Sequence, residues 1–327
     1  MRGSVRMGVV VEVNGRRLRI VPPAGARWLI SDLTGWKHDP LELTGPLEVV
    51  LPRRAYFEYA FLDGAGKPFA DPDNPNRAEN PWHDYARAVR IEGAPTLPEY
   101  PESLRGRVER ITVGSRRLVV YEPPRPPRVC LLVFDGTAYY RIGKMAQALE
   151  QLSLDGLAVP ARLVFSEPRR REREYRFAPE TERFVIDEIL PRVEGAFGAV
   201  ERCGLWGASL GGLAALWLAL EHPDVFPLVG AQSPALKAVP GGDDAHGDPE
   251  WLTGRYQAAA RLPENIVVQT GLLEWLLAPA RRLAAVLADR GALHAYREFP
   301  SGHNWYTWRI GLAEGLLDLL GGDLWGV

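Results

Sequence analysis

Residues 204–216 read Gly-Leu-Trp-Gly-Ala-Ser-Leu-Gly-Gly-Leu-Ala-Ala-Leu, and this stretch decides the fold. A short apolar strand pattern ends in a Gly-x-Ser-x-Gly turn around Ser209, and an apolar helix pattern follows directly. The turn is so sharp that the residues two before and two after the serine, Gly207 and Gly211, have to be small. We therefore expect the Ser209 hydroxyl to project from a strand-to-helix turn, over a helix N-terminus whose dipole favours negative charge. The competing interpretation is a glycine-rich turn that holds a serine by chance.

Strand-like and helical patterns alternate on both sides of this turn. Residues 129–134 are continuously apolar, as expected of a strand that is covered on both faces. The alternation predicts an α/β fold with a mostly parallel sheet wrapped by helices. The expected strands are 107–113, 117–121, 129–134, 161–165, 203–206, 227–231, 265–270 and 293–299, and the expected helices are 140–154, 179–197, 210–221, 278–290 and 305–320.

The first hundred residues have a different pattern. Asn14-Gly15 separates two short apolar runs, which is a strong signal for a β-hairpin. Several short strand patterns with turns between them predict an all-β sandwich over residues 1–93. Residues 94–104 are rich in proline and have no period, so they form the expected linker. The α/β domain is expected to span 105–327, because 327 residues exceed the usual size of one hydrophobic core.

The composition excludes some classes of partner. A formal net charge of −2 is unlike the basic balance of proteins that bind nucleic acid or anionic membranes, so we expect neither. We recognise no secretory leader, and no apolar run approaches the roughly 18 residues that a membrane helix needs. A cytoplasmic protein is therefore the expectation.

His303 is the candidate base for Ser209, because a serine at its ordinary pKa is a weak nucleophile. It lies in Ser301-Gly302-His303-Asn304, directly after the last expected strand and before the last helix. When the serine follows a strand in this kind of sheet, the partner histidine comes last in the chain, on that loop. Solvent-exposed or structural roles are expected for the other histidines, which are His38, His83, His222, His246 and His294.

Glu274 is the candidate third member of the group. A carboxylate on the loop after the preceding strand would hold the tautomer of the histidine and stabilise the imidazolium. Glu274 closely follows the strand expected at 265–270, and the spacing to His303 leaves room for one helix and one strand. The alternative is a solvated Glu274 beside a working Ser–His dyad.

Two backbone N–H groups have to stabilise the negative charge that develops on the substrate oxygen. Leu210, directly after the serine, should supply one of them. The other should come from the loop after 129–134, where the N–H of Gly136 or Thr137 is the candidate donor. Asp135 in this loop has no companion cluster of His or Asp residues, so we expect no metal ion and no cofactor.

Together these motifs resemble the esterase D-type branch of the α/β-hydrolases, and within it the enterochelin esterase-like proteins. The resemblance covers essentially the whole chain and is stronger in the α/β part than in the first domain. The residues that carry it are 129–136, the serine turn, Asp224-Val225-Phe226, Gln232-Ser233 and Gly302-His303 with Trp308-Arg309.

The resemblance implies an α/β-hydrolase domain preceded by a β-sandwich. It also implies a cytoplasmic esterase that cleaves the trilactone backbone of a catecholate siderophore. Ser209 would be the nucleophile, His303 the base and Glu274 the acid. The histidine motif departs from the family pattern Gly-Gly-His-Asp, because Ser301 and Asn304 stand at its first and last positions.

Substrate contacts are expected around the acid and the base. Trp275 and Trp305 flank these residues and would provide aromatic walls for a catechol or another flat acyl group. Arg169 and Arg170 open a basic run after the strand expected at 161–165, and loops after parallel strands rim the active site in such sheets. A solvated charged face is the alternative for this run. The expected partner is a small-molecule ester.

The first domain supports other hypotheses. Residues 56–64 and 69–75 also resemble the immunoglobulin-like modules that precede glycogen-branching enzymes, and such modules can bind glucan. A carbohydrate-linked feruloyl or acetyl esterase is therefore the second hypothesis. In siderophore esterases the corresponding domain serves as a lid or a dimerisation unit, so a homodimer is a further expectation. A third hypothesis is a binding module with a vestigial hydrolase domain, against which the intact serine, histidine and turn argue.

Overall fold

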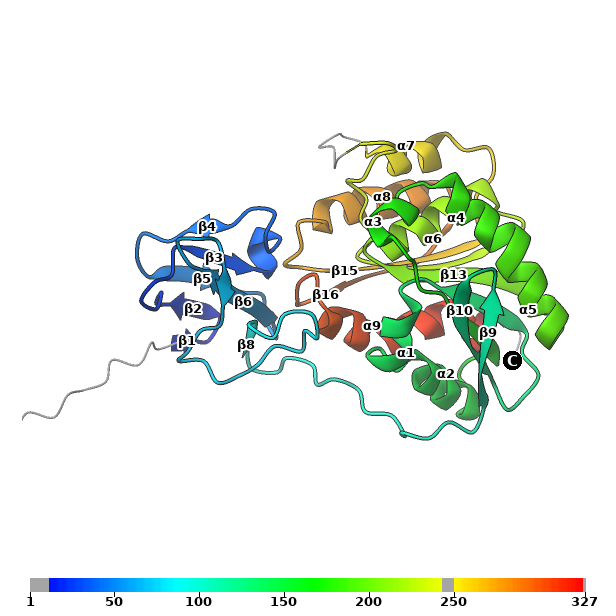
Figure 1. Ribbon diagram of the computed structural model, residues 1–327, viewed down its shortest axis with the longest axis horizontal. Coiled ribbons are helices and arrows are strands. Elements are labelled where there is room, and N and C mark those ends of the chain that lie inside the picture. The colour runs from blue at the N-terminus through cyan, green and yellow to red at the C-terminus, as the bar shows by residue number, and fades with distance from the viewer. Residues whose placement is uncertain (1–11, 243–249, 326–327) are drawn as a thin grey trace, which may run out of the picture. The chain divides into compact units, whose positions relative to one another are not determined.

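The computed structural model of the protein describes residues 12–242 and 250–325. The chain forms two compact units (Figure 1). The first unit holds Met1–Leu97 together with two short segments, Gly271–Trp275 and Glu298–Ile310, and the second unit holds the rest. A division drawn along the sequence alone leaves both short segments with the α/β part.

The first unit is built from antiparallel strands. They are β1 (Glu12–Asn14), β2 (Arg17–Ile20), β3 (Trp28–Ser31), β4 (Leu41–Glu42), β5 (Leu47–Val50), β6 (Tyr56–Leu62), β7 (Pro68–Phe69) and β8 (Arg87–Arg90), with a short helix η1 (Asp32–Thr34) after β3. One sheet has the order β1-β2-β5, and the other has the order β4-β3-β6-β7 with β8 paired to β6. The hairpin predicted at Asn14-Gly15 is confirmed by the pairing of β1 with β2. The part of the expected strand before residue 12 lies outside the described residues.

Strand β6 is central to the core of the first unit. All seven of its residues are buried. Because side chains alternate along a strand, Phe57, Tyr59 and Phe61 pack on one face, and Ala60 and Leu62 pack on the other. The strand therefore lies between two apolar layers.

The second unit holds an eight-stranded sheet. Its strands are β9 (Arg107–Val113), β10 (Arg116–Glu122), β11 (Val129–Val133), β12 (Ala161–Phe165), β13 (Arg202–Ala208), β14 (Leu228–Gln232), β15 (Asn265–Gly271) and β16 (Leu293–Phe299). Their order is β16-β15-β14-β13-β11-β12-β10-β9. Strands β11 to β15 pair in parallel, and β10 pairs antiparallel with β9 and β12. The mostly parallel sheet expected from the sequence is confirmed.

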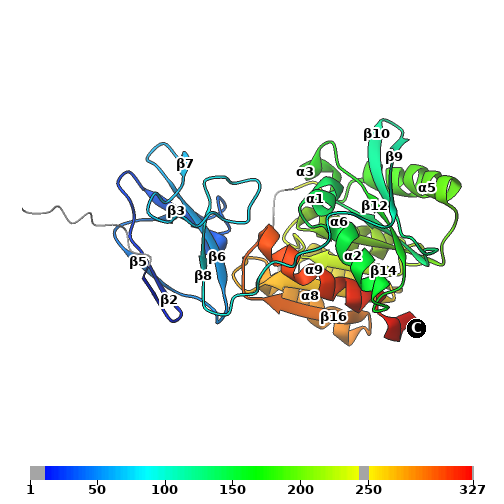
Figure 2. The ribbon, with the colours of Figure 1, turned by 90° about the horizontal axis from the view of Figure 1, so that it is seen from below.

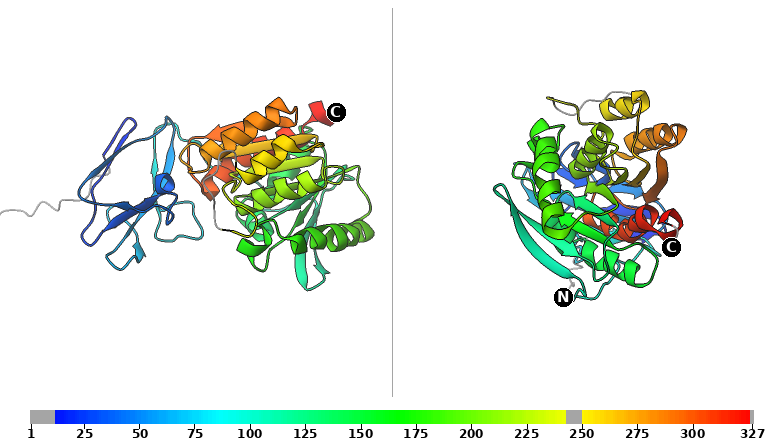
Figure 3. Two further views of the ribbon diagram at one scale, coloured as in Figure 1. Left: turned by 90° about the horizontal axis from the view of Figure 1, so that it is seen from above. Right: turned by 90° about the vertical axis from the view of Figure 1, so that its right-hand side faces the viewer.

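Helices cover both faces of this sheet. They are α1 (Gly136–Arg141), α2 (Met145–Leu154), α3 (Arg171–Glu174), α4 (Pro179–Arg183), η2 (Phe184–Ile189), α5 (Leu190–Phe197), α6 (Leu210–Glu221), α7 (Trp251–Ala258), α8 (Leu277–Asp289), α9 (Trp305–Leu320) and α10 (Gly322–Trp325). One apolar cluster joins α6, α7 and α8 to one face of the sheet, and these helices face the viewer in the left view of Figure 3. Helices α2 and α9 lie on the other face and come forward in Figure 2. No helix among the described residues is both long and apolar enough to span a bilayer.

Three helical segments differ from the sequence pattern. The helix expected at 140–154 is interrupted by Lys144, whose backbone is left-handed, and α1 and α2 lie on either side of it. The helix expected at 179–197 contains a wide π-type turn, η2, in its middle. Helix α7 has no counterpart among the expected elements, because its residues show little amphipathic period.

Arg162 is a buried charge that connects three elements of the second unit. It lies on β12, and its guanidinium pairs with Glu122 of β10. It also donates to the carbonyls of Phe197 and Gly198 at the end of α5, at 2.6 and 2.8 Å. A buried guanidinium is tolerated only when its donors find acceptors, so this position depends on all three elements.

Replacing Arg162 by methionine leaves the Glu122 carboxylate almost buried and without its partner. We expect the free energy of unfolding to fall by about 3–5 kcal/mol, measured by urea denaturation. Arg128→Met is the matched control, since Arg128 pairs with Glu201 at the surface, where solvent screens the ion pair, and its loss should lower the stability much less. Equal losses in the two variants would contradict the role given to Arg162.

Candidate active site

Ser209 occupies a strained turn between β13 and α6. The strand ends at Ala208, and the helix begins at Leu210. The serine has φ 55° and ψ −123°, a backbone conformation that residues with a side chain rarely adopt. A Cβ on Gly207 would lie 2.4 Å from the carbonyl carbon of Gly211, so the chain can reverse here only because both residues are small. The turn expected from the sequence is present.

Hydrogen bonds from the neighbouring strand hold this turn. The N–H of Ser209 donates to the carbonyl of Gln232 at 2.9 Å, and the carbonyl of Ser209 accepts from the N–H of Ala235 at 3.0 Å. The side chain of Gln232 accepts from the Tyr139 hydroxyl at 2.6 Å and donates to the side chain of Gln269 at 2.7 Å. Buried polar networks that are satisfied in this way rigidify their surroundings. Neither Tyr139 nor Gln269 stands out in the sequence, because a polar residue inside an apolar pattern carries no motif.

The candidate oxyanion donors differ in what their N–H groups contact. Leu210 is the first residue of α6, so its N–H has no acceptor one turn earlier in the helix. The N–H of Gly136 donates to the carbonyl of Ser166 at 2.9 Å. The N–H of Thr137 donates to Oε2 of Glu167, an exposed side chain, at 3.0 Å. Thr137 is therefore the better candidate of the two, because a surface carboxylate can move away and a backbone carbonyl at a strand end cannot.

An ion pair clamps the loop that carries these donors. Both oxygens of Asp135 accept from Arg171, each at 2.7 Å, and the N–H of Asp135 donates to the Tyr175 hydroxyl at 3.0 Å. Burial alone would lower the pKa of Arg171, but the hydrogen bonds and the charge of Asp135 raise it above its ordinary value. Paired bonds of this kind fix orientation as well as distance.

Arg171 is a site residue that no sequence motif marks. The candidates before it lie differently: Arg169 donates to the carbonyl of Ser115 at 2.9 Å, and Arg170 is exposed. The backbone N–H groups of both donate to the buried Glu174. The run of arginines was the available signal, but its spacing does not indicate which member turns inward.

Glu274 and His303 come together in the first unit. Nδ1 of His303 lies 3.1 Å from Oε2 of Glu274, whose side chain is fully buried. The other carboxylate oxygen accepts from the N–H of Gly271 at 2.8 Å. Because an ionised carboxylate can only accept, this contact assigns the imidazole proton to Nδ1 and makes Nε2 the basic nitrogen.

Backbone hydrogen bonds join the two segments that carry these residues. The N–H of Leu272 donates to the carbonyl of Phe299 at 2.8 Å, and the N–H of Leu273 donates to the carbonyl of Ser301 at 3.0 Å. The turn after β15 and the loop after β16 are therefore tied to each other, which keeps Glu274 beside His303.

A series of aromatic rings adjoins His303. Trp275 and Trp308 lie next to it, with ring centroids at 4.6 and 5.2 Å, and Trp305 packs on Trp308 at 5.0 Å. Trp82 stacks on Trp305 at 5.8 Å and is 55% exposed. Trp305 itself is buried, so Trp82 is the ring of this pair that a ligand can reach. The sequence carries no signal for Trp82, because a tryptophan in an irregular loop belongs to no motif.

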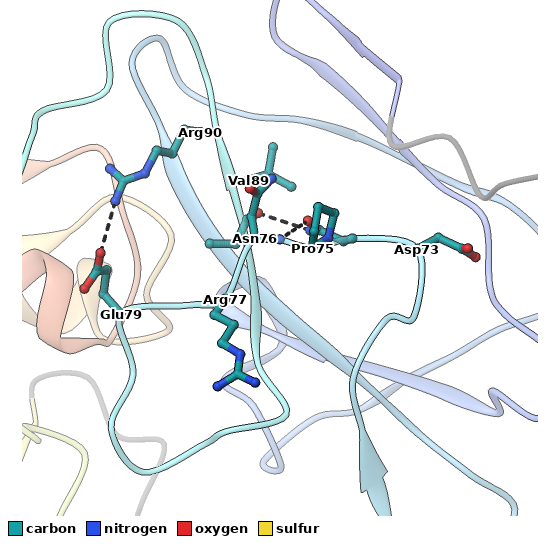
Figure 4. Close-up of a pocket in the computed structure, with 9 residues that line it drawn as sticks. Asp73, Pro75, Asn76, Arg77, Glu79, Val89 and Arg90 are labelled. Atoms are coloured by element: carbon teal, nitrogen blue, oxygen red, sulfur yellow. Dashed lines mark hydrogen bonds and ion pairs between the residues drawn. The ribbon is translucent and has the colours of Figure 1, made fainter.

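A polar pocket of about 730 Å³ lies beside β8 in the first unit (Figure 4). Its walls come from β8 and from residues 73–79, and an ion pair between Arg90 and Glu79, 3.6 Å long, stands on one side. No residue of the segment 301–304 that carries His303, the histidine loop, lines this pocket. Within residues 12–242 and 250–325, no group of three or more His, Cys, Asp or Glu side chains is arranged to hold a metal ion.

A family model described as "Putative esterase" matches residues 114–319, which is well over half of the chain. The chain belongs to this esterase family. The esterase is therefore a carboxylic ester hydrolase, as its sequence motifs led us to expect.

Several known proteins are similar to the esterase at low sequence identity. The Bacillus subtilis (strain 168) protein YjcH, described as uncharacterized, is 23% identical over 206 residues, which cover 58% of this chain and 83% of YjcH. The enterobactin esterase FES from Shigella flexneri, solved in the presence of 2,3-dihydroxy-N-benzoyl-serine, matches with a TM-score of 0.70 at 20% identity, over 95% of this chain and 92% of that chain. A ferulic acid esterase matches with a TM-score of 0.53 at 17% identity, over 66% of this chain and 98% of that chain. The α/β-hydrolase domain predicted from the sequence is confirmed.

Replacing Arg171 by glutamine removes the clamp on the Asp135 loop. We expect a loss of about 1–2 kcal/mol in the free energy of unfolding, less than for a fully buried pair because the Arg171 side chain is 38% exposed. Ester hydrolysis should slow about 10-fold or more, because the loop carries Thr137, the candidate oxyanion donor. Arg170→Gln is the matched control and should leave the stability within about 0.5 kcal/mol of the parent. Equal stability of both variants would refute the clamp.

Proposed function

We propose that this esterase is a serine hydrolase in which Ser209 is the nucleophile, His303 the general base and Glu274 the residue that orients it. The observation that carries the proposal is the strained backbone of Ser209 inside a Gly-x-Ser-x-Gly turn. Strained backbone conformations persist only where the surrounding structure holds them, and they are most often found at functional sites. The contact between His303 and Glu274 supports the proposal, since a serine hydrolase needs a base with one nitrogen held by a carboxylate.

In the proposed reaction, Oγ of Ser209 attacks the ester carbonyl carbon while Nε2 of His303 takes the hydroxyl proton. The N–H groups of Leu210 and Thr137 stabilise the resulting oxyanion. The tetrahedral intermediate collapses, the bond to the alkoxy oxygen breaks, and His303 returns the proton to the leaving alcohol. A water molecule then attacks the acyl-enzyme with the same nitrogen as base, the bond between the acyl carbon and Oγ of Ser209 breaks, and Oγ takes the proton back. One ester and one water thus give an acid and an alcohol.

For the substrate, we infer small-molecule esters whose acyl part carries a flat aromatic ring, as in catecholate siderophores. The exposed ring of Trp82 and the half-buried ring of Trp275 support this inference, because aromatic faces bind flat rings by stacking. The likeness to an enterobactin esterase supports it only through the fold.

A carbohydrate-linked feruloyl or acetyl ester is the second candidate substrate. The polar pocket beside β8 favours it, because residues 73–79 of its wall overlap the stretch that resembles glucan-binding modules. In either case we propose that the antiparallel sheets of the first unit form an immunoglobulin-like sandwich.

Ser209→Ala removes the proposed nucleophile. We expect kcat on p-nitrophenyl butyrate to fall by at least about 10⁴-fold, because the acyl-enzyme can no longer form. A fluorophosphonate probe should modify the parent at Ser209, identified by peptide mass, and should not modify the variant. Ser115→Ala, at an exposed turn serine, is the control and should keep the parent rate. A Ser209→Ala protein that hydrolyses the ester as fast as the parent would disprove the proposal.

Trp82→Ala removes the exposed ring. We expect kcat/KM on ethyl 2,3-dihydroxybenzoate to fall about 2- to 12-fold relative to ethyl butyrate, which corresponds to about 0.5–1.5 kcal/mol of ring stacking. Trp82→Phe keeps a ring and should keep most of the preference. An unchanged ratio in Trp82→Ala would mean that this residue does not select the acyl group. Turnover of feruloyl sugars by the parent, without turnover of a catecholate trilactone, would favour the second candidate.

A further inference from the structure

A buried carboxylate lies against the histidine loop. Asp32, in η1, is completely buried, and its Oδ1 and Oδ2 accept from Nδ2 of Asn304 at 3.1 and 3.2 Å. Oδ2 also accepts from the N–H of Glu58 at 2.7 Å. In the part of the chain that the structure describes, no lysine, arginine or histidine forms an ion pair with Asp32, so its hydrogen-bond partners are neutral donors.

Asn304 connects this carboxylate to the segment that carries His303. It directly precedes α9, and its Oδ1 accepts from the N–H of Thr307 at 3.0 Å, which is the bond of a helix N-cap. Because the amide oxygen caps the helix, the amide nitrogen is directed to Asp32. The hydroxyl of Thr307 donates to the carbonyl of Gly302 at 2.6 Å. The residues on both sides of His303 are thus held by hydrogen bonds.

Gly302 packs directly on Asp32. A Cβ at Gly302 would lie 2.1 Å from Cγ of Asp32, so no side chain fits there. Asp32 therefore contacts the residue before His303 by packing and the residue after it, Asn304, by hydrogen bonds. These contacts restrict the backbone on both sides of the proposed base.

Burying the carboxylates of Asp32 and Glu58 side by side costs folding free energy. Glu58 is also completely buried and accepts from the Tyr56 hydroxyl at 3.0 Å and from Nδ2 of Asn80 at 3.2 Å. Burial, together with the charge of Glu58, raises the pKa of Asp32 well above its ordinary value, and burial raises the pKa of Glu58 to about 7. A protein with well-packed apolar side chains in such a place is often at least as stable as one with buried charges. Core packing alone therefore does not account for Asp32.

We propose that Asp32 is a positioning residue for ester hydrolysis: it holds Asn304, and through Asn304 it sets the orientation of the loop that presents His303. The inference rests on the proposed role of His303 as base. A displacement of a catalytic group by about 1 Å can slow a reaction about 100-fold, so the support of this loop matters for the rate. The N-terminal sheet thereby becomes part of the catalytic arrangement.

The donor and the acceptor of this pair can be exchanged. Asp32→Asn places one amide opposite another, so an N–H group faces a donor. Asn304→Asp keeps an oxygen to cap α9 but places two carboxylates face to face. In the double variant D32N/N304D, an amide again meets a carboxylate, with the hydrogen bond running in the opposite direction.

We expect each single variant to lower kcat on p-nitrophenyl butyrate about 10- to 100-fold with little change in KM, because orientation and not binding is lost. D32N/N304D should recover most of that loss. All rates are measured well below the Tm of each variant. Asp71→Asn is the matched control: Asp71 is another completely buried acid of the same unit, bonded to the Tyr59 hydroxyl at 2.6 Å, and its loss should lower Tm but keep kcat.

Parent kcat in both single variants, or a double variant no better than the worse single variant, would overturn the inference. His303→Gln separates this result from the proposed function. Full activity of His303→Gln would disprove the proposed function itself. Loss of activity in His303→Gln, with full activity in D32N and N304D, would disprove only the role of Asp32.

Discussion

The positive φ of Ser209 is the constraint on which the second unit depends. Holding a residue in such a conformation costs of order 1–3 kcal/mol, so neighbouring elements have to stabilise it. Strand β13 lies inside the sheet, between β14 and β11, and β14 supplies the acceptor for the N–H of Ser209. The buried side chains of Tyr139, Gln232 and Gln269 then fix the end of β14. A strand at the edge of the sheet would have neighbours on one side only and could not support the turn in this way.

Glu274 and His303 are held in place by packing within the first unit. Tyr306, in the first turn of α9, stacks on Tyr56 of β6 with ring centroids 3.8 Å apart, and the guanidinium of Arg90 lies over both rings. Loops that carry functional residues are usually the most mobile parts of a fold. Here the loop of His303 is attached to a helix that packs on a central strand and to a buried carboxylate. Side chains of the N-terminal sheet therefore restrain the segment that carries His303.

The elements found correctly from the sequence are those whose signals are local. The serine turn, the parallel strands and the hairpin at Asn14-Gly15 follow from neighbouring residues and from period. The break at Lys144 was missed, because a lysine in a left-handed conformation looks like any other helix residue. Trp82 and Arg171 were missed for a related reason: each belongs to an irregular segment or to a run of like residues, in which only the folded chain selects one.

The sequence by itself determined the turn at Ser209 and the loops of Glu274 and His303, because each follows a strand whose pattern is legible over a few residues. It did not indicate which other residues hold these segments in place. Asp32 and Asn304 are separated by 272 positions, and the Arg171 clamp joins residues 36 positions apart. Partners at such separations are selected by how sheets and loops pack, and no periodicity along the chain records that choice. Only the tertiary structure decided that Arg171 holds the Asp135 loop and that Asp32 holds the segment of His303.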